Sequence, residues 1–382
     1  MNWGELITLE YGKPVKDKEA TDGKVPVYGT NGQIGTSHLP AQCKHPSFIL
    51  GRKGAYRGVH YSDCPFSVID TAFYAEPLTD RIDLKWAYYK FLTYDINGMD
   101  SGSAIPSTDR YQIYSIEVEV PPLEKQRKIV AVLDCIDRKI NINQKVNDNL
   151  EQQAQAIFKE WFIENPENNE WSTGTFSELI KTTLNGDWGK EAPTGNNTEK
   201  VYCIRGADIP EVKAGNKGKM PTRYILPKNF VKKQLTAGDI VVEISGGSPT
   251  QSTGRCTAIT QSLLDRYDSG MVCTNFCKAI KPKEGYSLFI YYYWQYLYGK
   301  GIFFSYENGT TGIKNLDFSG FIETETILIP PVDKVIAFDD YCKSIFNQIF
   351  ANGKQNEHLA VLRDTLLPKL MSGELDVSDI DL

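Results

Sequence analysis

A segment of this chain occurs twice, 209 residues apart. Residues 120–125 (VPPLEK) return as residues 329–334 (IPPVDK), and the asparagine-containing stretch 143–150 returns with the same shift at 352–359. Each copy follows a long, aromatic-rich region in which short apolar runs alternate with glycine turns, a pattern typical of strands. A repeat of about half the chain predicts two similar modules, each followed by one copy of the repeated segment.

Each copy of the repeat opens a heptad pattern, and we predict long helices over residues 121–165 and 329–375. The double proline that begins each copy stops the preceding strand and suits a first helical turn. From Ile129 to Trp161 apolar residues recur at the two seam positions of a coiled coil, and they do so again from Phe338 to Leu370. At 1.5 Å per residue, the first seam spans about 50 Å, more than one turn of duplex DNA.

Both helices carry asparagine at two successive seam positions, and these residues bear on how the helices pair. A buried asparagine costs stability unless it meets another hydrogen-bonding side chain, so it favours one register. An antiparallel pair puts Asn143 opposite Asn356 and Asn147 opposite Asn352. A parallel pair also matches the asparagines, and separate packing of each helix on its own module is a third arrangement. We favour the antiparallel pair, which relates the modules by a pseudo-two-fold axis, although its layer of Ile136 with Arg363 fits poorly.

The fold class predicted from these patterns is α+β: two mixed, strand-rich modules joined by two long helices that form an antiparallel coiled coil. The modules occupy residues 1–120 and 166–328, and residues 376–382 form an acidic tail. Within the modules we expect helices at 84–94 and 288–298. We expect strands at 25–28, 47–50, 67–74, 116–120, 239–245 and 326–329.

Composition limits the class of protein. The net charge of −6 argues against bulk electrostatic binding of nucleic acid, although it leaves room for local basic faces. No apolar run approaches 18 residues, and the N-terminal residues lack the basic and apolar regions of a signal peptide. Eight cysteines spread over 382 residues are typical of reduced thiols. We therefore expect a cytoplasmic protein with no membrane segment.

The helical segments resemble the specificity subunit of bacterial type I restriction–modification systems. Residues 121–130 (PPLEKQRKIV) resemble the start of the central conserved helix of that family, and residues 143–150 and 156–162 resemble its later part. Residues 362–375 (LRDTLLPKLMSGEL) resemble the C-terminal signature. Residues 102–106 (GSAIP) match a recurring element before the first helix, whereas residues 308–314 (NGTTGIK) are a loose version of it.

This resemblance implies a host-defence protein with two target-recognition domains, each of which reads half of a split duplex DNA sequence. It implies that the conserved helices bind methyltransferase subunits and that this chain is not catalytic by itself. The implied complex holds two methyltransferase and two restriction (motor–nuclease) subunits. No cofactor is expected on this chain, whereas S-adenosylmethionine, ATP and Mg are expected on the partner subunits.

Motifs for catalysis and metal binding are missing from the sequence. There is no Asn-Pro-Pro-Tyr or Asp-Pro-Pro-Tyr tetrapeptide and no phosphate-binding loop of the Gly-x-x-x-x-Gly-Lys-Ser/Thr type. Asp239 and Glu243 lack the lysine that a nuclease motif would place two residues later. Cys273 and Cys277 lack a second pair at zinc spacing, and the four histidines supply no partner motif. We predict no catalytic residues, no metal ligands and two buried thiols.

Side chains that could contact DNA lie in loops that combine basic or amide groups with aromatics and glycines. Arginine pairs with guanine and asparagine or glutamine with adenine, whereas lysine more often contacts phosphates. Ordinary solvated turns are the alternative for any one of these positions. The base-reading candidates are Tyr28, Thr30, Asn31, Arg52, Lys53, Tyr56, Arg57, Ser103, Arg110, Arg205, Ser248, Gln251, Arg255, Asn308, Thr310 and Lys314. The phosphate candidates are Lys217, Lys219, Lys232 and Lys233.

Three alternative functions stay open at this point. The acidic net charge favours a two-headed protein-binding scaffold with no role on nucleic acid. A specificity subunit of a related system, in which one chain combines methylase and nuclease, is a close variant of the resemblance. A self-sufficient enzyme has the least support, because its motifs are missing. Salt-sensitive DNA binding by the assembled complex separates the specificity subunit from the scaffold.

Overall fold

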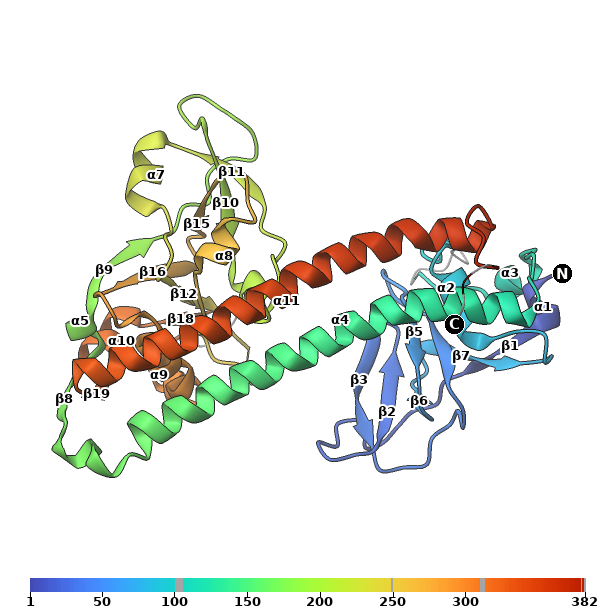
Figure 1. The fold of residues 1–382 in the computed structure, drawn as a ribbon, viewed down its shortest axis with the longest axis horizontal. Coiled ribbons are helices and arrows are strands. Elements are labelled where there is room, and N and C mark those ends of the chain that lie inside the picture. Colours follow the sequence, from blue (N-terminus) through green and yellow to red (C-terminus); the bar gives the residue numbers. More distant parts are fainter. Residues whose placement is uncertain (100–105, 249, 310–312, 379, 381–382) are drawn as a thin grey trace. The chain divides into compact units, whose positions relative to one another are not determined.

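The chain divides into two compact units (Figure 1). The computed structural model describes residues 1–99, 106–248, 250–309, 313–378 and 380. Unit 1 comprises Met1–Arg138 and Leu359–Leu382, and unit 2 comprises Lys139–His358. Two long helices, α4 (Leu123–Phe158) and α11 (Val332–Ser372), contribute a stretch to each unit. Each unit therefore combines one strand-rich module with part of both helices.

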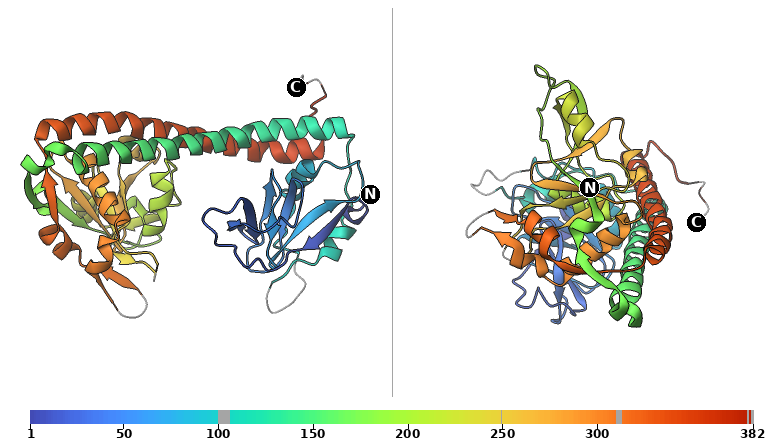
Figure 2. Two further views of the ribbon diagram at one scale, coloured as in Figure 1. Left: turned by 90° about the horizontal axis from the view of Figure 1, so that it is seen from below. Right: turned by 90° about the vertical axis from the view of Figure 1, so that its left-hand side faces the viewer.

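The two long helices predicted from the heptads are confirmed. Both begin directly after a double proline, and α4 continues into a π-helical turn, η1 (Lys159–Ile163). In each unit the stretches of α4 and α11 lie side by side and run antiparallel (Figures 1 and 2). In unit 1, Ile129, Leu133 and Leu370 are buried in one apolar cluster. In unit 2, the Trp161 and Phe338 rings lie 6.2 Å apart. The antiparallel arrangement is therefore the correct one.

The described residues of unit 1 form two sheets. A four-stranded antiparallel sheet has the order β1-β7-β4-β5. A smaller sheet has the order β3-β2-β6, in which β2 pairs antiparallel with β3 and parallel with β6. The strands are β1 (Ile7–Tyr11), β2 (Val25–Gly29), β3 (Gly32–Ser37), β4 (Ser47–Gly51), β5 (Val59–Ser62), β6 (Ser67–Val68) and β7 (Ala72–Pro77).

Unit 2 repeats both sheets. Its antiparallel sheet has the order β9-β16-β12-β14, which matches β1-β7-β4-β5 strand for strand. Its second sheet, β11-β10-β15, again combines one antiparallel and one parallel pairing. The strands are β9 (Ile180–Asn185), β10 (Glu199–Ile204), β11 (Thr222–Ile225), β12 (Ile240–Glu243), β14 (Cys256–Ala258), β15 (Gly270–Cys273) and β16 (Cys277–Pro282). The repeat seen in the helices therefore extends through the modules.

Short helices repeat as well. In each unit a four-residue helix with a capping box opens the module: α1 (Trp3–Leu6) and α5 (Phe176–Leu179). The aromatic helices expected at 84–94 and 288–298 are α2 (Leu84–Phe91) and α9 (Ser287–Gly299). A helix precedes the strand-like segment before each double proline: α3 (Arg110–Ser115) and α10 (Phe318–Thr324).

Unit 2 also carries elements without a counterpart among the described parts of unit 1. The largest addition is a three-stranded sheet with the order β13-β18-β17. Its strands are β13 (Ser245–Gly246), β17 (Glu307–Asn308) and β18 (Lys314–Leu316). A further pair consists of β8 (Ser172–Thr175) and β19 (Thr326–Ile329). The helices are η2 (Pro166–Glu170), η3 (Gly206–Asp208), α6 (Ile209–Lys213), α7 (Pro227–Lys233), α8 (Gln261–Leu264) and η4 (Ile302–Tyr306).

Two sequence expectations need correction, at residues 67–74 and 116–120. The run at 67–74 is split into β6 and β7, because Asp70 and Thr71 form a turn. The run at 116–120 forms an isolated bridge, Asn2 with Glu117, because the partner segment turns into α1 at Trp3. The start of the acidic tail is held in unit 1: Val377 is buried, and Asp376 pairs with Lys125 at 3.1 Å.

Aromatic side chains dominate both cores. Trp3, Trp86 and Phe91 pack together in unit 1, and Phe158, Phe289 and Trp294 are buried in unit 2. All eight cysteines lie in described positions and carry free thiols, with Cys273 and Cys277 buried as expected. Among the described residues, no helix is long and apolar enough to cross a membrane.

Candidate nucleic-acid interface

Three segments of unit 1 that contain DNA candidates converge at one end of its main sheet. They are the tip of the β2–β3 hairpin, the loop after β4 and the segment before α3. Gly58 donates its backbone N–H to Thr30 O at 3.0 Å, and Gly54 donates to Pro106 O at 3.0 Å. Thr108 donates in turn to Arg52 O at 2.8 Å. We call this group, residues 28–31, 52–58 and 106–110, loop cluster 1.

A tyrosine organises two of the three arginines of loop cluster 1. Tyr11 ends β1, and its ring lies 4.7 Å from the Arg52 guanidinium carbon and 4.8 Å from that of Arg110. Arg52 also donates to Asp70 O at 3.0 Å, and Arg110 donates to Leu9 O at 3.4 Å. Cation–π contacts and carbonyl hydrogen bonds leave both cationic groups charged, so they fix two positive side chains without neutralising them.

Glycine allows the close approach within loop cluster 1. A Cβ at Gly51, the last residue of β4, would lie 2.6 Å from Thr30 Oγ1 and 2.8 Å from Arg57 Cα. Any larger residue would therefore push the hairpin tip away from the loop. His60 packs in the same place, with Nε2 3.4 Å from Thr30 O. Burial lowers the pKa of His60, although the hydrogen bond to Thr30 opposes this effect.

The remaining candidates in unit 1 differ in accessibility. Tyr56 is 63% exposed, and Asn31 is also exposed. Lys53 and Tyr28 are partly exposed. Arg57 is only 2% exposed, and its guanidinium donates to the carbonyls of Gly54, Ile96 and Asn97. We therefore assign Arg57 a role in holding the loop. Ser103 lies outside the described residues.

In unit 2, the corresponding loop after β12 meets the β17–β18 hairpin. Ser245 and Gly246 of β13 pair with Asn315 and Lys314 of β18. Glu307 Oε1 accepts from the Thr253 backbone N–H at 2.6 Å, which ties the loop to the hairpin. We call this group, residues 245–248, 250–255, 307–309 and 313–314, loop cluster 2. Thr310 lies outside the described residues.

Carboxylates neutralise the cationic candidates of loop cluster 2. Glu243 accepts two hydrogen bonds from Arg255, at 2.8 and 2.7 Å, and Lys314 Nζ lies 2.7 Å from Glu307 Oε2. Burial alone would raise the pKa of Glu307, but the Lys314 and Thr253 hydrogen bonds outweigh it and hold the pKa below its usual value. The pairing with Glu243 fixes the position of the Arg255 guanidinium group. Three of its five N–H donors remain for other acceptors. Gln251 and Asn308 are exposed beside these pairs, and Ser248 is partly exposed.

The other basic candidates of unit 2 lie outside loop cluster 2 or beside it. Arg205 is bound to Asp208 through Nε and Nη2, which raises the pKa of Arg205, and it also donates to Lys219 O at 2.8 Å. Lys217 Nζ lies 4.4 Å from the Tyr267 ring. On α7, Lys233 donates to Gly186 O at 2.8 Å. Lys219 and Lys232 are exposed.

Comparison with known proteins shows which proteins this chain resembles. Residues 2–152 match the family model described as the type I restriction modification DNA specificity domain. Over this stretch the chain is similar to the specificity subunits of type I restriction–modification systems. It is 28% identical to the MjaIX specificity subunit of Methanocaldococcus jannaschii, with 79% of this chain and 71% of that protein covered. It is 24% identical to the HindI specificity subunit of Haemophilus influenzae, with 75% of this chain and 74% of that protein covered.

One solved structure shares the fold of this chain. The S subunit of the type I restriction–modification system from M. genitalium superposes with a TM-score of 0.55. The two are 17% identical, and the match covers 97% of this chain and 95% of that one. The mixed α+β fold with two long helices is therefore that of a specificity subunit.

Proposed function

We propose that this chain recognises a split duplex DNA target, one half with each unit, and gives a type I restriction–modification complex its sequence specificity. The observation that carries the proposal is the repeat of both sheet orders in the two units. Each copy has a loop cluster at the same place. It follows the strand that is third in the order of the main sheet, which is β4 in unit 1 and β12 in unit 2. Two similar readers on one chain suit a target with two specific halves.

Within each loop cluster, accessibility separates the proposed roles. Phosphate contacts position a protein on DNA, and contacts to base edges provide specificity. The exposed amides of Asn31, Gln251 and Asn308 suit bidentate pairing with adenine in the major groove. Arg52 and Arg110, which stay charged around Tyr11, suit phosphates or guanines. Lys53 of loop cluster 1 suits phosphates, because lysine is a compact point charge, and so do Lys219 and Lys232, which lie outside the loop clusters.

We further propose that α4 and α11 recruit the methyltransferase and restriction subunits. Both helices expose aliphatic side chains to solvent: Ile142 and Val146 on α4 in unit 2, and Val361 and Leu362 on α11 in unit 1. Adjacent exposed aliphatic residues on a surface are typical of protein-binding sites. Two such pairs suit two methyltransferases. In this proposal S-adenosylmethionine, ATP and Mg bind to the partner subunits, and this chain contributes no catalytic group.

The continuity of α4 supports a defined spacer between the half-sites. Its 36 residues correspond to about 54 Å at 1.5 Å per residue. One turn of duplex DNA is about 34 Å, so helices of this length suit half-sites separated by more than a turn. The length of the helices, rather than DNA contacts in the spacer, would then determine which spacer is accepted.

A scaffold without a role on nucleic acid is the competing function, and the net charge of −6 favours it. The two functions differ in their response to salt. A DNA reader that neutralises phosphates loses affinity steeply as the salt concentration rises. A scaffold that binds only proteins gives no such dependence on duplex DNA.

The decisive experiment is co-expression of this chain with its methyltransferase partner in an unmethylated host, followed by sequencing of modified bases. We expect adenine methylation in both halves of one split motif. The chain alone, supplied with S-adenosylmethionine, should methylate nothing. Soluble, associated subunits that leave the genome unmodified would instead favour the scaffold.

A further inference from the structure

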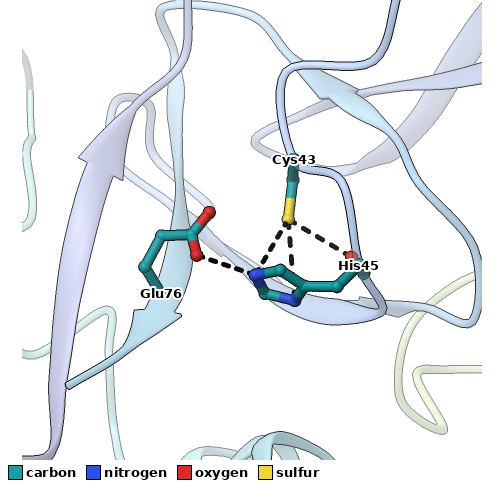
Figure 3. Close-up of side chains that lie close together, drawn as sticks. All are labelled: Cys43, His45 and Glu76. Carbon is teal, nitrogen blue, oxygen red and sulfur yellow. Dashed lines mark hydrogen bonds and ion pairs between the residues drawn. The ribbon is translucent and has the colours of Figure 1, made fainter.

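Three potential metal ligands of unit 1 lie close together outside the loop clusters (Figure 3). Cys43 and His45 belong to the connection between β3 and β4, and Glu76 lies on β7. Their ligand atoms all lie within 4.8 Å of one another. His45 Nε2 is 2.7 Å from Glu76 Oε2 and 3.9 Å from Cys43 Sγ. Figure 3 shows the imidazole between the thiol and the carboxylate.

We propose that Cys43, His45 and Glu76 bind one Zn²⁺ ion. Thiolate sulfur, imidazole nitrogen and carboxylate oxygen are the three donor types that zinc prefers. Zinc bonds of about 2.0–2.3 Å in a tetrahedron place donor atoms roughly 3.3–3.7 Å apart. The observed separations bracket this range, so small side-chain rotations are enough to admit the ion.

The tautomer of His45 supports a cation at this place. Its Nδ1 lies 2.9 Å from Pro46 O, a carbonyl that can only accept, so Nδ1 carries a hydrogen. In the neutral imidazole, Nε2 then presents a lone pair to the Glu76 carboxylate, and two acceptors face each other. Either a proton or a metal ion must lie between them. A hydrogen bond from the second ring nitrogen to a carbonyl is also the usual partner arrangement of a zinc-bound histidine.

The thiol completes the ligand set. Cys43 is fully buried, and its backbone N–H and carbonyl both pair with Phe66, so its position is fixed. Burial is the main reason that the pKa of Cys43 rises to about 11. A Zn²⁺ ion bound here would displace the thiol proton to solvent and hold the sulfur as the thiolate.

The proposed ligand set leaves one coordination position of the ion open. Three protein ligands leave the fourth tetrahedral site for water or an exogenous ligand. The His45 and Glu76 side chains are 37% and 33% exposed, so the ion can enter from their side. Bound zinc would fasten the β3–β4 connection to β7 of the main sheet. The alternative is that His45 and Glu76 form an ion pair only.

Cobalt substitution in the full-length apoprotein tests the proposal. Titration with Co²⁺ should give one ion per chain, a near-ultraviolet thiolate-to-cobalt charge-transfer band and intense tetrahedral d–d bands, all of which Zn²⁺ abolishes. Cys43→Ser should remove the charge-transfer band and weaken binding at least tenfold. Glu76→Gln should keep the band and also weaken binding at least tenfold. Cys64→Ser, which changes an exposed cysteine of the same unit, should leave the titration unchanged.

The wild-type titration decides the outcome even when a variant fails to fold. Absence of a thiolate band in the folded wild-type protein at micromolar Co²⁺ overturns the proposal. It is also overturned when folded Cys43→Ser binds the metal like wild type, or when Cys64→Ser removes the band. Circular dichroism establishes which variants are folded, and Glu76→Gln, which keeps the shape of the side chain, serves as the second variant.

Discussion

Asn143 on α4 donates through Nδ2 to Oδ1 of Asn356 on α11 at 2.8 Å, and both side chains are buried. One layer away, Asn352 donates to Asn147 Oδ1 at 2.8 Å. Two consecutive amide pairs fit one antiparallel register of the stretches in unit 2. A slip by one heptad would place most of these amides opposite aliphatic residues, where they would lose their partners.

The first prediction concerns Asn147, which reaches beyond the helix pair. Its Nδ2 also donates to Ala214 O, at the end of α6, at 3.0 Å. Asn147→Leu should lower the free energy of unfolding by about 1–3 kcal/mol, because the Asn352 amide and the Ala214 carbonyl lose a buried partner. Urea unfolding measures the change. Asn149→Leu, on the exposed face of α4, is the matched control and should stay within about 0.5 kcal/mol. Equal stability of Asn147→Leu and wild type would contradict the assignment.

The helices were predictable because heptads and prolines are local signals. The asparagine positions favoured a pairing but left parallel and antiparallel arrangements open, since both align the amides. The layer of Ile136 with Arg363 was expected to fit poorly, and the structure shows how the charge of Arg363 is paired. Arg363 Nη1 donates at 3.0 Å to Asp137, the neighbour of Ile136, and Asp137 also accepts from Tyr89 OH at 2.7 Å. A seam arginine is thus paired by a residue outside the seam, which the heptad pattern does not reveal.

The candidate site was only partly predictable. Loops with basic and amide residues could be picked out, yet their partners come from distant strands. Nothing in the sequence near Arg255 indicates that Glu243 will bind its guanidinium, and Tyr11 was missed because it ends a strand far from Arg52 and Arg110. The possible zinc ligand Glu76 follows His45 by 31 residues and meets it across the sheet. Such relationships depend on strand order, which local patterns do not determine.

The second prediction tests the role of Tyr11. Tyr11→Ala removes the ring that lies against both Arg52 and Arg110, so these side chains lose their fixed positions. Each cation–π contact is worth about 0.5–1 kcal/mol at an exposed site. Affinity of the assembled methyltransferase complex for its specific duplex should therefore fall roughly fivefold to thirtyfold, as measured by fluorescence anisotropy. Tyr11→Phe keeps the ring and should bind like wild type. The same loss in both variants would assign the effect to the hydroxyl and contradict the stacking role.

The third prediction uses the pairing of Lys314 with Glu307. Glu307→Gln removes the carboxylate charge and frees one cation of loop cluster 2 for a phosphate. The slope of log affinity against log salt concentration should become steeper by about one. Glu284→Gln changes the net charge equally at an exposed position away from the loop cluster and should leave the slope unchanged. If both variants steepen the slope alike, the effect is one of overall charge and the assignment of Lys314 fails.

The fourth prediction concerns pH. Burial lowers the pKa of His60 below its usual value of 6.5, so the folded protein favours the neutral imidazole. The unfolded chain therefore binds a proton at His60 more readily than the folded protein does. Above about pH 6.5 His60 is neutral in both states, and its contribution to the free energy of unfolding is fully present. This contribution is lost as the pH falls through the lower pKa of the folded state. The pKa of His45 is raised, since the Glu76 and Pro46 hydrogen bonds outweigh burial, so its contribution changes in the opposite direction. Because the two histidines act in opposite directions, the effect of His60 is measured by comparing wild type with a variant that lacks it.

Thermal unfolding of wild type and His60→Gln from about pH 8 to about pH 5 measures this contribution. The wild-type Tm should fall more steeply with acidification than the Tm of the variant. His38→Gln, which changes an exposed histidine of the same unit, should track the wild type. Parallel curves for wild type and His60→Gln would show that His60 does not titrate differently in the folded state.

The last prediction tests whether helix length sets the spacer. One heptad inserted into α4 after Ile140, with one inserted into α11 before Leu359, keeps the seam pattern and lengthens each helix by about 10 Å. This rise corresponds to about three base pairs of duplex DNA. Sequencing of modified bases should then reveal the same two half-sites separated by about three more base pairs. A heptad inserted into α4 alone has no counterpart in α11, so the layers on the two sides of the insertion cannot all keep their register, and methylation should fall without a new spacer. An unchanged spacer in the double insertion would show that contacts other than helix length select the target.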